Sequence, residues 1–176
     1  ASVRYLNRME ANLTNISEKL LISFALFLYV ASLFSVSFTA MDGTNIIYGY
    51  EALIFGFIQT VLGLLGFFGA LFQLQLVFLV VHALLFLPWL ANIAMLLSLI
   101  FLYTSKNKNL CKITTIFGVI CTSAFLLKPE ATIGETMKIV PVSVSSGTYL
   151  WFIASLTLLL TYVFKSIPNK EINQDK

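Results

Sequence analysis

Charged residues are scarce in this sequence: Asp, Glu, Lys and Arg make up only 11% of its 176 residues, while 59% are hydrophobic. A soluble domain usually has about 25% charged residues. So few charges leave too little polar surface to cover a water-soluble globule, which makes lipid the solvent for much of the chain. The net charge of +3 is spread over separate clusters, and this spread argues against a nucleic-acid surface.

Residues that carry catalytic or metal chemistry are also few. A zinc site needs three or four Cys, His or carboxylate ligands, and His82 is the only histidine. The sequence has no glycine-elbow serine, glycine-rich phosphate loop, dinucleotide fingerprint or paired catalytic carboxylates. We therefore predict a protein that is not an enzyme and uses no metal or cofactor. The two cysteines, Cys111 and Cys121, point to different sides of one helix and are expected to be buried.

Long apolar runs dominate the rest of the chain. Residues 20–40 predict a first spanning helix, because such a helix needs about 20 apolar residues. Asn15 and Glu18 have the spacing of a capping box at its start. Residues 137–144 alternate and are rich in β-branched side chains, which predicts a short strand or hairpin outside the lipid. The predicted organisation is a cytoplasmic segment over residues 1–19, a helical membrane domain over residues 20–165 and a cytoplasmic tail over residues 166–176.

The number of crossings depends on the apolar run over residues 52–103. Hydropathy alone divides this run near Gln73 and Gln75 and gives five crossings, but basic residues are then shared five to six between the two sides. If the run crosses once, both termini and the loop over residues 104–112 share one side with nine of the eleven basic residues. Basic residues favour the cytoplasmic side. We therefore predict an all-α transmembrane fold with four crossings, five being the alternative, and a re-entrant or interfacial helix within residues 52–75.

Small and amide side chains recur at spacings of three and four residues in the first half of that run. They form one stripe on a helical face: Gly56, Gln59, Gly63, Gly66, Ala70 and Gln73. Small residues let membrane helices approach closely, and amides hydrogen-bond across the contact. The stripe is therefore a packing seam within one protomer, a seam between protomers or the lining of a pore.

A second polar face follows on the next helix, where Gln75, His82, Trp89 and Asn92 share one side. Pro88 lies within this helix and is expected to bend it. An ionisable residue inside a membrane suggests a function, so His82 is either a neutral hydrogen-bonding residue or part of a pH-sensing or ion path. Glu51, at the membrane boundary, either caps a helix or attracts cations in an oligomer. Trp151, Tyr149 and Tyr103 fit interfacial anchors.

Three segments, Gly49–Gly56, Trp89–Asn92 and Gly147–Ser155, resemble motifs of a group of small uncharacterised bacterial membrane proteins. In that group a proline commonly follows the Trp-Leu-Ala-Asn segment, whereas Ile93 follows it here. The resemblance implies a four-crossing protein of the bacterial inner membrane and implies no specific function.

The polar stripes, together with little extramembrane mass, predict a non-enzymatic membrane protein that forms a homo-oligomer, with a pore or membrane effector as its function. The alternative is an accessory subunit of a larger transport, secretion or defence complex. The predicted partners are the lipid bilayer, further copies or subunits of a membrane complex and a soluble cytoplasmic protein, with no nucleic acid.

Overall fold

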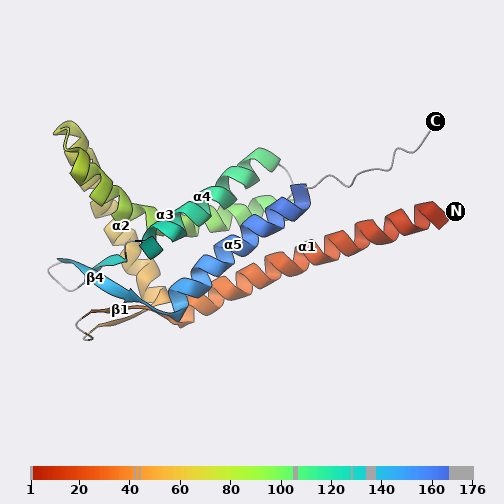
Figure 1. Ribbon diagram of the computed structural model, residues 1–176, viewed down its shortest axis with the longest axis horizontal. Helices are drawn as coiled ribbons and strands as arrows, with labels where there is room; N and C mark the ends of the chain where they lie inside the picture. Colours follow the sequence, from red (N-terminus) through yellow and green to blue (C-terminus); the bar gives the residue numbers. More distant parts are fainter. Residues whose placement is uncertain are drawn as a thin grey trace.

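The computed structural model describes residues 2–41, 43, 45–104, 107–127, 129–133 and 138–166, with the backbone alone for residues 2–15, 79, 81–82, 84–86, 132–133 and 138–139. The described chain is mostly helical and carries one small sheet (Figure 1). Its helices are α1 (Ser2–Phe34), α2 (Gly49–Phe72), α3 (Leu76–Thr104), α4 (Lys108–Leu127) and α5 (Ser146–Ser166). Its strands are β1 (Val36–Ala40), β2 (Ile46–Tyr48), β3 (Glu130–Ile133) and β4 (Lys138–Val144).

Among the described residues, five helical stretches are long and apolar enough to cross a membrane. Two of the stretches are parts of helices, Ile16–Phe34 in α1 and Leu87–Thr104 in α3. The other three are the whole of α2, α4 and α5. Large apolar side chains such as Phe27 and Leu65 are exposed on the helix surfaces. A soluble protein rarely exposes such contiguous apolar surface. The prediction of a membrane-embedded helical protein is therefore confirmed.

Helix α1 differs from its prediction at both ends. It begins at Ser2 rather than Asn15, so the predicted capping box does not start it. It ends at Phe34, and Val36–Ala40 forms strand β1 where a helix to residue 40 was predicted. Valine, phenylalanine and threonine favour a strand. Backbone bonds fix the change of direction, because the Gly49 N–H donates to the Ser35 carbonyl at 3.0 Å.

The strands form one antiparallel sheet in the order β2-β1-β4-β3. In its centre Phe38 of β1 is paired with Val144 of β4, which joins segments from opposite ends of the sequence. The predicted strand over residues 137–144 is confirmed by β4, which pairs with β3 to form a hairpin. Strands β1 and β2 are joined through a turn in which Gly43 has a φ of +71°, a conformation that favours glycine.

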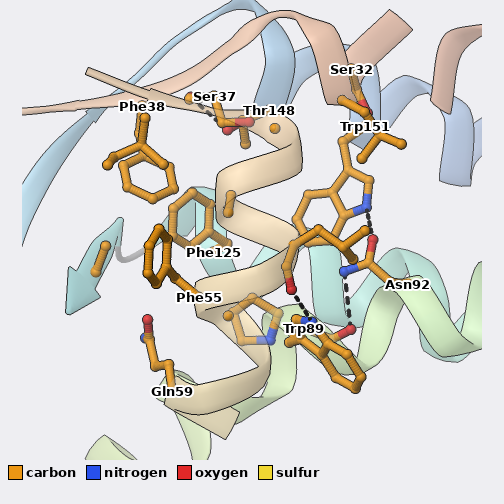
Figure 2. Close-up of a pocket in the computed structure, with 18 of the residues that line it drawn as sticks. Ser32, Ser37, Phe38, Phe55, Gln59, Trp89, Asn92, Phe125, Thr148 and Trp151 are labelled. Atoms are coloured by element: carbon orange, nitrogen blue, oxygen red, sulfur yellow. Dashed lines mark hydrogen bonds between the residues drawn. The ribbon is translucent and has the colours of Figure 1, made fainter. Parts of the chain in front are cut away.

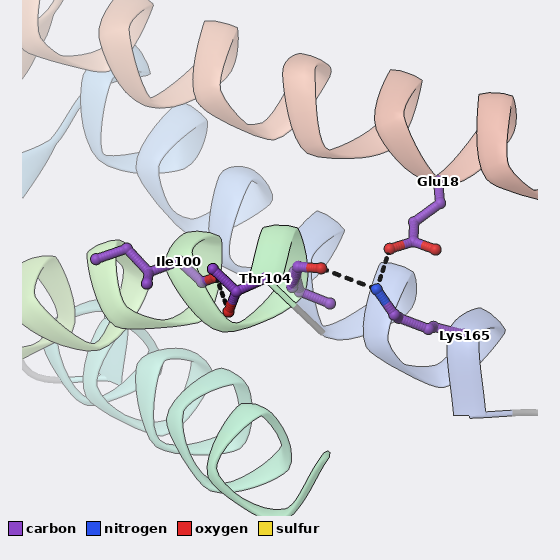
Figure 3. A network of polar contacts seen from close by, with 5 residues as sticks. Glu18, Ile100, Thr104 and Lys165 are labelled. Carbon is purple, nitrogen blue, oxygen red and sulfur yellow. Dashed lines mark hydrogen bonds and ion pairs between the residues drawn. The ribbon is translucent and has the colours of Figure 1, made fainter. Parts of the chain in front are cut away.

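The sheet marks one end of the helical bundle. Helices α1 and α4 end beside it, and α2 and α5 begin there (Figure 1). A polar contact marks the other end, where Lys165 of α5 forms an ion pair with Glu18 of α1 (Figure 3). The Lys165 ammonium also donates to the Leu102 carbonyl of α3 at 2.8 Å. We call this contact the polar latch; it brings together α1, the last turns of α5 and the C-terminal end of α3.

Helix α2 and the first part of α3 form a hairpin, the arm, that projects from the bundle (Figure 1). Residues 73–75 make its turn, where Leu74 has a φ of +54° and the Gln75 N–H donates to the Ala70 carbonyl at 3.0 Å. Beyond the arm α3 changes direction and enters the bundle (Figure 1). Pro88 lies inside α3. Because proline removes a backbone hydrogen bond, it accounts for the predicted bend.

Candidate functional site

A cavity of about 560 Å³ lies beneath α2 at the sheet end of the bundle (Figure 2). Its walls come from all five helices and from β1, β2 and β3. Three aromatic residues, Phe38, Phe55 and Phe125, gather on one side of it, and the ring centroids of Phe38 and Phe125 are 5.7 Å apart. Sites for small molecules usually measure about 300–1,000 Å³ and are mostly apolar. The cavity is therefore large enough for a ligand.

Asn92 of α3 organises the opposite wall (Figure 2). Its Oδ1 accepts from the Tyr29 hydroxyl of α1 at 3.2 Å and from the Trp151 Nε1 of α5 at 3.1 Å. Its Nδ2 donates to the Trp89 carbonyl at 3.2 Å. One carboxamide thus ties three helices together, and each of its three hydrogen bonds holds a residue of the wall.

Helix α2 is attached to this wall chiefly through Trp89 of α3. The Trp89 Nε1 donates to the Leu53 carbonyl of α2 at 2.8 Å, and its ring lies 5.3 Å from that of Phe57. Gly56 gives the indole its space, because a Cβ at this position would lie 2.8 Å from the Trp89 Cδ1. The contact fixes α2 against α3 at the edge of the cavity.

Close backbone approaches hold the sheet end of the cavity. A Cβ on Gly49, the first residue of α2, would lie 2.1 Å from the Ser32 carbonyl oxygen. A Cβ on Gly147 would lie 2.9 Å from the Val36 carbonyl oxygen. The neighbouring Thr148 hydroxyl donates to the Ser37 carbonyl at 2.7 Å. Glycine at these two positions therefore lets α2 and α5 begin in contact with the chain that leads from α1 into β1.

The chemistry of the cavity wall is uncharged. None of the described residues that line it is Asp, Glu, Lys, Arg or His. The Tyr29 hydroxyl and the indole N–H groups of Trp89 and Trp151 already donate to atoms of the wall. Within the described part of the chain, no buried side-chain nitrogen or oxygen lacks a partner. A hydrocarbon group suits this environment, because it forms no hydrogen bonds and would not lie beside a buried charge.

The predicted stripe on α2 is divided between several environments. Gly56 lies against Trp89, Gly63 and Ala70 are buried within the chain, and Gly66 is half-buried. Gln59 lines the cavity, whereas Gln73 is exposed at the turn of the arm. Helix α2 packs mainly on α3, and within the stripe Gly56 serves this contact through Trp89.

The second polar face is also only partly assembled. Trp89 and Asn92 meet in the cavity wall, but Gln75 is exposed at the start of the arm's second helix. His82 belongs to α3, and its side chain lies outside the described part of the structure. Glu51 takes the capping role of the two predicted for it, since its Oε2 accepts from the Tyr48 N–H at 2.9 Å.

Sequence reasoning missed two residues of the cavity wall. Tyr29 was not singled out, and Trp151 was predicted only as an interfacial anchor, whereas its indole bonds to Asn92. Both partners lie about 60 positions from Asn92 in the sequence, so no local pattern links them. The only available signal was that the three segments Gly49–Gly56, Trp89–Asn92 and Gly147–Ser155 stood out together. Each of them contributes residues to the cavity wall.

The described residues contain no group of three or more His, Cys, Asp or Glu side chains that could hold a metal ion. No protein-family model, curated protein or solved structure matches the chain. The resemblance to small bacterial membrane proteins therefore stays a prediction.

Proposed function

We propose that the chain crosses the membrane four times, with both termini and residues 104–112 on the cytoplasmic side. The polar latch supports this topology, because it puts the C-terminal end of α3 at the bundle end opposite the sheet. Helix α2 begins at the sheet, so α2 and α3 together connect opposite ends and make one net crossing. If α2 and α3 each crossed the membrane, α3 would instead end on the same side as the sheet. The arm then lies at the outer side of the membrane as a re-entrant or interfacial element.

Helix lengths agree with this arrangement. From Glu18 to Phe34, α1 rises about 24 Å, and α3 also rises about 24 Å from Pro88 to Thr104. Both lengths are close to the hydrocarbon thickness of about 30 Å. The charge pattern agrees as well, since nine of the eleven basic residues fall on the side of the latch.

Cysteine substitutions at two exposed positions test this topology. Asn109 in α4 and Ser143 in β4 are both exposed, and the native Cys111 and Cys121 are buried. With a membrane-impermeant maleimide on intact cells, we expect Ser143→Cys to be labelled and Asn109→Cys to react only after permeabilisation. Five crossings from a cytoplasmic N-terminus would reverse the two results.

The function that the geometry supports best is binding of a membrane amphiphile through its hydrocarbon part. The single observation that carries this proposal is the 560 Å³ cavity with an uncharged wall whose indole and phenol donors are already engaged. A polar metabolite would lose hydrogen bonds to water without replacing them there. An acyl or isoprenoid chain loses none and is abundant in the surrounding lipid. The role is binding rather than catalysis.

A matched pair of substitutions on α2 tests the binding proposal. Ile58 lines the cavity, whereas Ile54, one turn earlier, does not and is 61% exposed. Tryptophan at position 58 should fill part of the cavity, and tryptophan at position 54 should face lipid. We expect native mass spectrometry in mild detergent to find co-purified lipid on the wild type and on Ile54→Trp, with several-fold less on Ile58→Trp. Equal retention by the two variants would refute the cavity as the binding site.

The pore and the accessory-subunit hypotheses stay predictions. The pore hypothesis drew on the α2 stripe, whose small residues pack inside the protomer and so give it no support. The expectation of a homo-oligomer rested on the same stripe together with the polar face of α3, and it also stays a prediction.

A further inference from the structure

Helix α1 carries an apolar stripe with the heptad spacing of a coiled coil. Intervals of three and four residues alternate without a break along its whole length. The positions, which take the letters a and d in turn, are Leu6, Met9, Leu13, Ile16, Leu20, Ser23, Phe27, Val30 and Phe34. Eight of these nine residues are apolar, and none is charged. A strict repeat of this kind is the pattern of a helix that packs along a second helix.

The bundle uses the opposite face of α1. In the same register, Glu18, Ala25 and Ser32 occupy position f, which lies across the helix from a and d. Glu18 forms the polar latch, while Ala25 is 1% exposed and Ser32 is 3% exposed. Ile16, Leu20 and Phe27, at d and a positions, are 61%, 68% and 65% exposed. From Ile16 to Phe34, where the side chains are described, the heptad face is therefore left open by the fold of the single chain.

The stripe continues where lipid cannot explain it. Glu18 takes part in the latch at the end of the bundle, where α3 and α5 also end. Leu6, Met9 and Leu13 precede this boundary in a segment that also holds Arg4, Arg8 and Glu10. A helix in water gains nothing from an apolar stripe unless another surface covers it. The continuous register across the boundary indicates one covering element over the whole helix.

We propose that this element is α1 of a second copy, so that the protein forms a parallel, two-fold symmetric dimer along α1. Two copies inserted in the same orientation present their α1 helices parallel, and the two-fold axis then runs along the membrane normal. The flanking charges are compatible: in the parallel pairing Glu10 at e faces Tyr5 at g of the second copy, and Lys19 at g faces Phe24 at e. No like charges meet across the contact.

The size of the contact is sufficient for a specific dimer. The 33 residues of α1 make a helix about 50 Å long and about 10 Å wide. This strip corresponds to roughly 500 Å² on each copy, or about 1,000 Å² in total, which reaches the lower limit of about 1,000 Å² for a specific interface. The segment before Ile16 is too short to pair strongly alone, and its continuation in the membrane supplies most of the contact.

Cysteine cross-linking in membranes tests the register. Leu13→Cys at position a and Ile16→Cys at position d should give a disulfide-linked dimer under mild oxidation. Ala11→Cys at position f is the matched control and should cross-link several-fold less, because the f positions of two paired helices point apart. The wild type provides the baseline, since Cys111 and Cys121 are buried. Equal yields at positions 11 and 13, or no product at position 13, would overturn the proposal.

The mass of the protein in mild detergent gives an independent readout. Light scattering, with the detergent contribution subtracted, should give two copies for the wild type and for Ala11→Glu, and one copy for Leu13→Glu. The last variant sets two carboxylates against each other at an a position, on the side of α1 across from the f position of Glu18. A wild-type mass of one copy, or of more than two, would refute this dimer, as would a Leu13→Glu variant that keeps two copies.

Discussion

Replacing Asn92 by leucine is the sharpest perturbation of the cavity wall. Leucine has the same number of side-chain heavy atoms with the same branching, so the change removes hydrogen bonds without opening a large void. The Tyr29 hydroxyl and the Trp151 Nε1 lose their acceptor, since both donate to Asn92 Oδ1 at 3.2 and 3.1 Å. A buried donor without a partner costs about 1–3 kcal/mol, whereas side-chain hydrogen bonds in a membrane protein average about 0.6 kcal/mol. Asn92, Tyr29 and Trp151 are only partly buried, so we expect the free energy of unfolding to fall by about 1–3 kcal/mol in total.

The two cysteines supply the assay for this prediction. Cys111 is 4% and Cys121 0% exposed, so their reaction with a thiol-reactive dye reports unfolding. The unfolding midpoint of Asn92→Leu should fall, while that of Asn109→Leu, the same change at an exposed position of α4, should stay near the wild-type value. Tyr29→Phe adds a second check: it should cost stability in the wild type and cost nothing in Asn92→Leu, where the hydroxyl has already lost its acceptor. Additive losses, or equal midpoints for Asn92→Leu and Asn109→Leu, would refute the reasoning.

Three further predictions use the same unfolding assay. Gly49→Ala should destabilise the protein by more than about 1 kcal/mol, because its Cβ would lie 2.1 Å from a backbone oxygen, whereas Gly69→Ala, with nothing within 4 Å, should be neutral or stabilising. Lys165→Met should cost about 1 kcal/mol by breaking the latch, and Glu18→Gln should then cost little more; two independent losses would contradict the pairing. Thr122→Val and Ser155→Ala should each cost about 0.6 kcal/mol and should not add, since their hydroxyls bond to each other at 3.0 Å, and full additivity would argue against that bond.

Features set by the local sequence could be predicted. The apolar runs give the helices, the alternating residues before the last helix give β4, and the turn at residues 73–75 falls where the hydropathy of the long run is broken. Strand β1 was missed because Val36 and Phe38 continue the apolar run of α1, and hydropathy does not distinguish a strand from a helix there. It pairs with β2 across a nearby turn and with β4, which is more than 100 residues away.

Features set by docking could not be predicted. Glu18 has the right spacing for a local cap, yet it pairs with Lys165, because α1 packs along α5 and continues beyond it. Trp89 and Asn92 stood out in one helix, but their role became visible only when Tyr29 and Trp151 approached from two other helices. A polar residue in an apolar run therefore indicates that a contact exists and does not indicate with what.

Helix α1 links the two proposals and also keeps them separable. One side of it gives Tyr29, Ser32 and Leu33 to the cavity wall, while the a and d positions Phe27 and Phe34 face away from the bundle. A second copy bound to its outer face would therefore not enter the cavity. None of the described residues that line the cavity precedes the latch in the sequence. Leu13→Glu should therefore change the mass and leave bound lipid unaffected, and Ile58→Trp should do the opposite, so that either proposal can fail while the other stands.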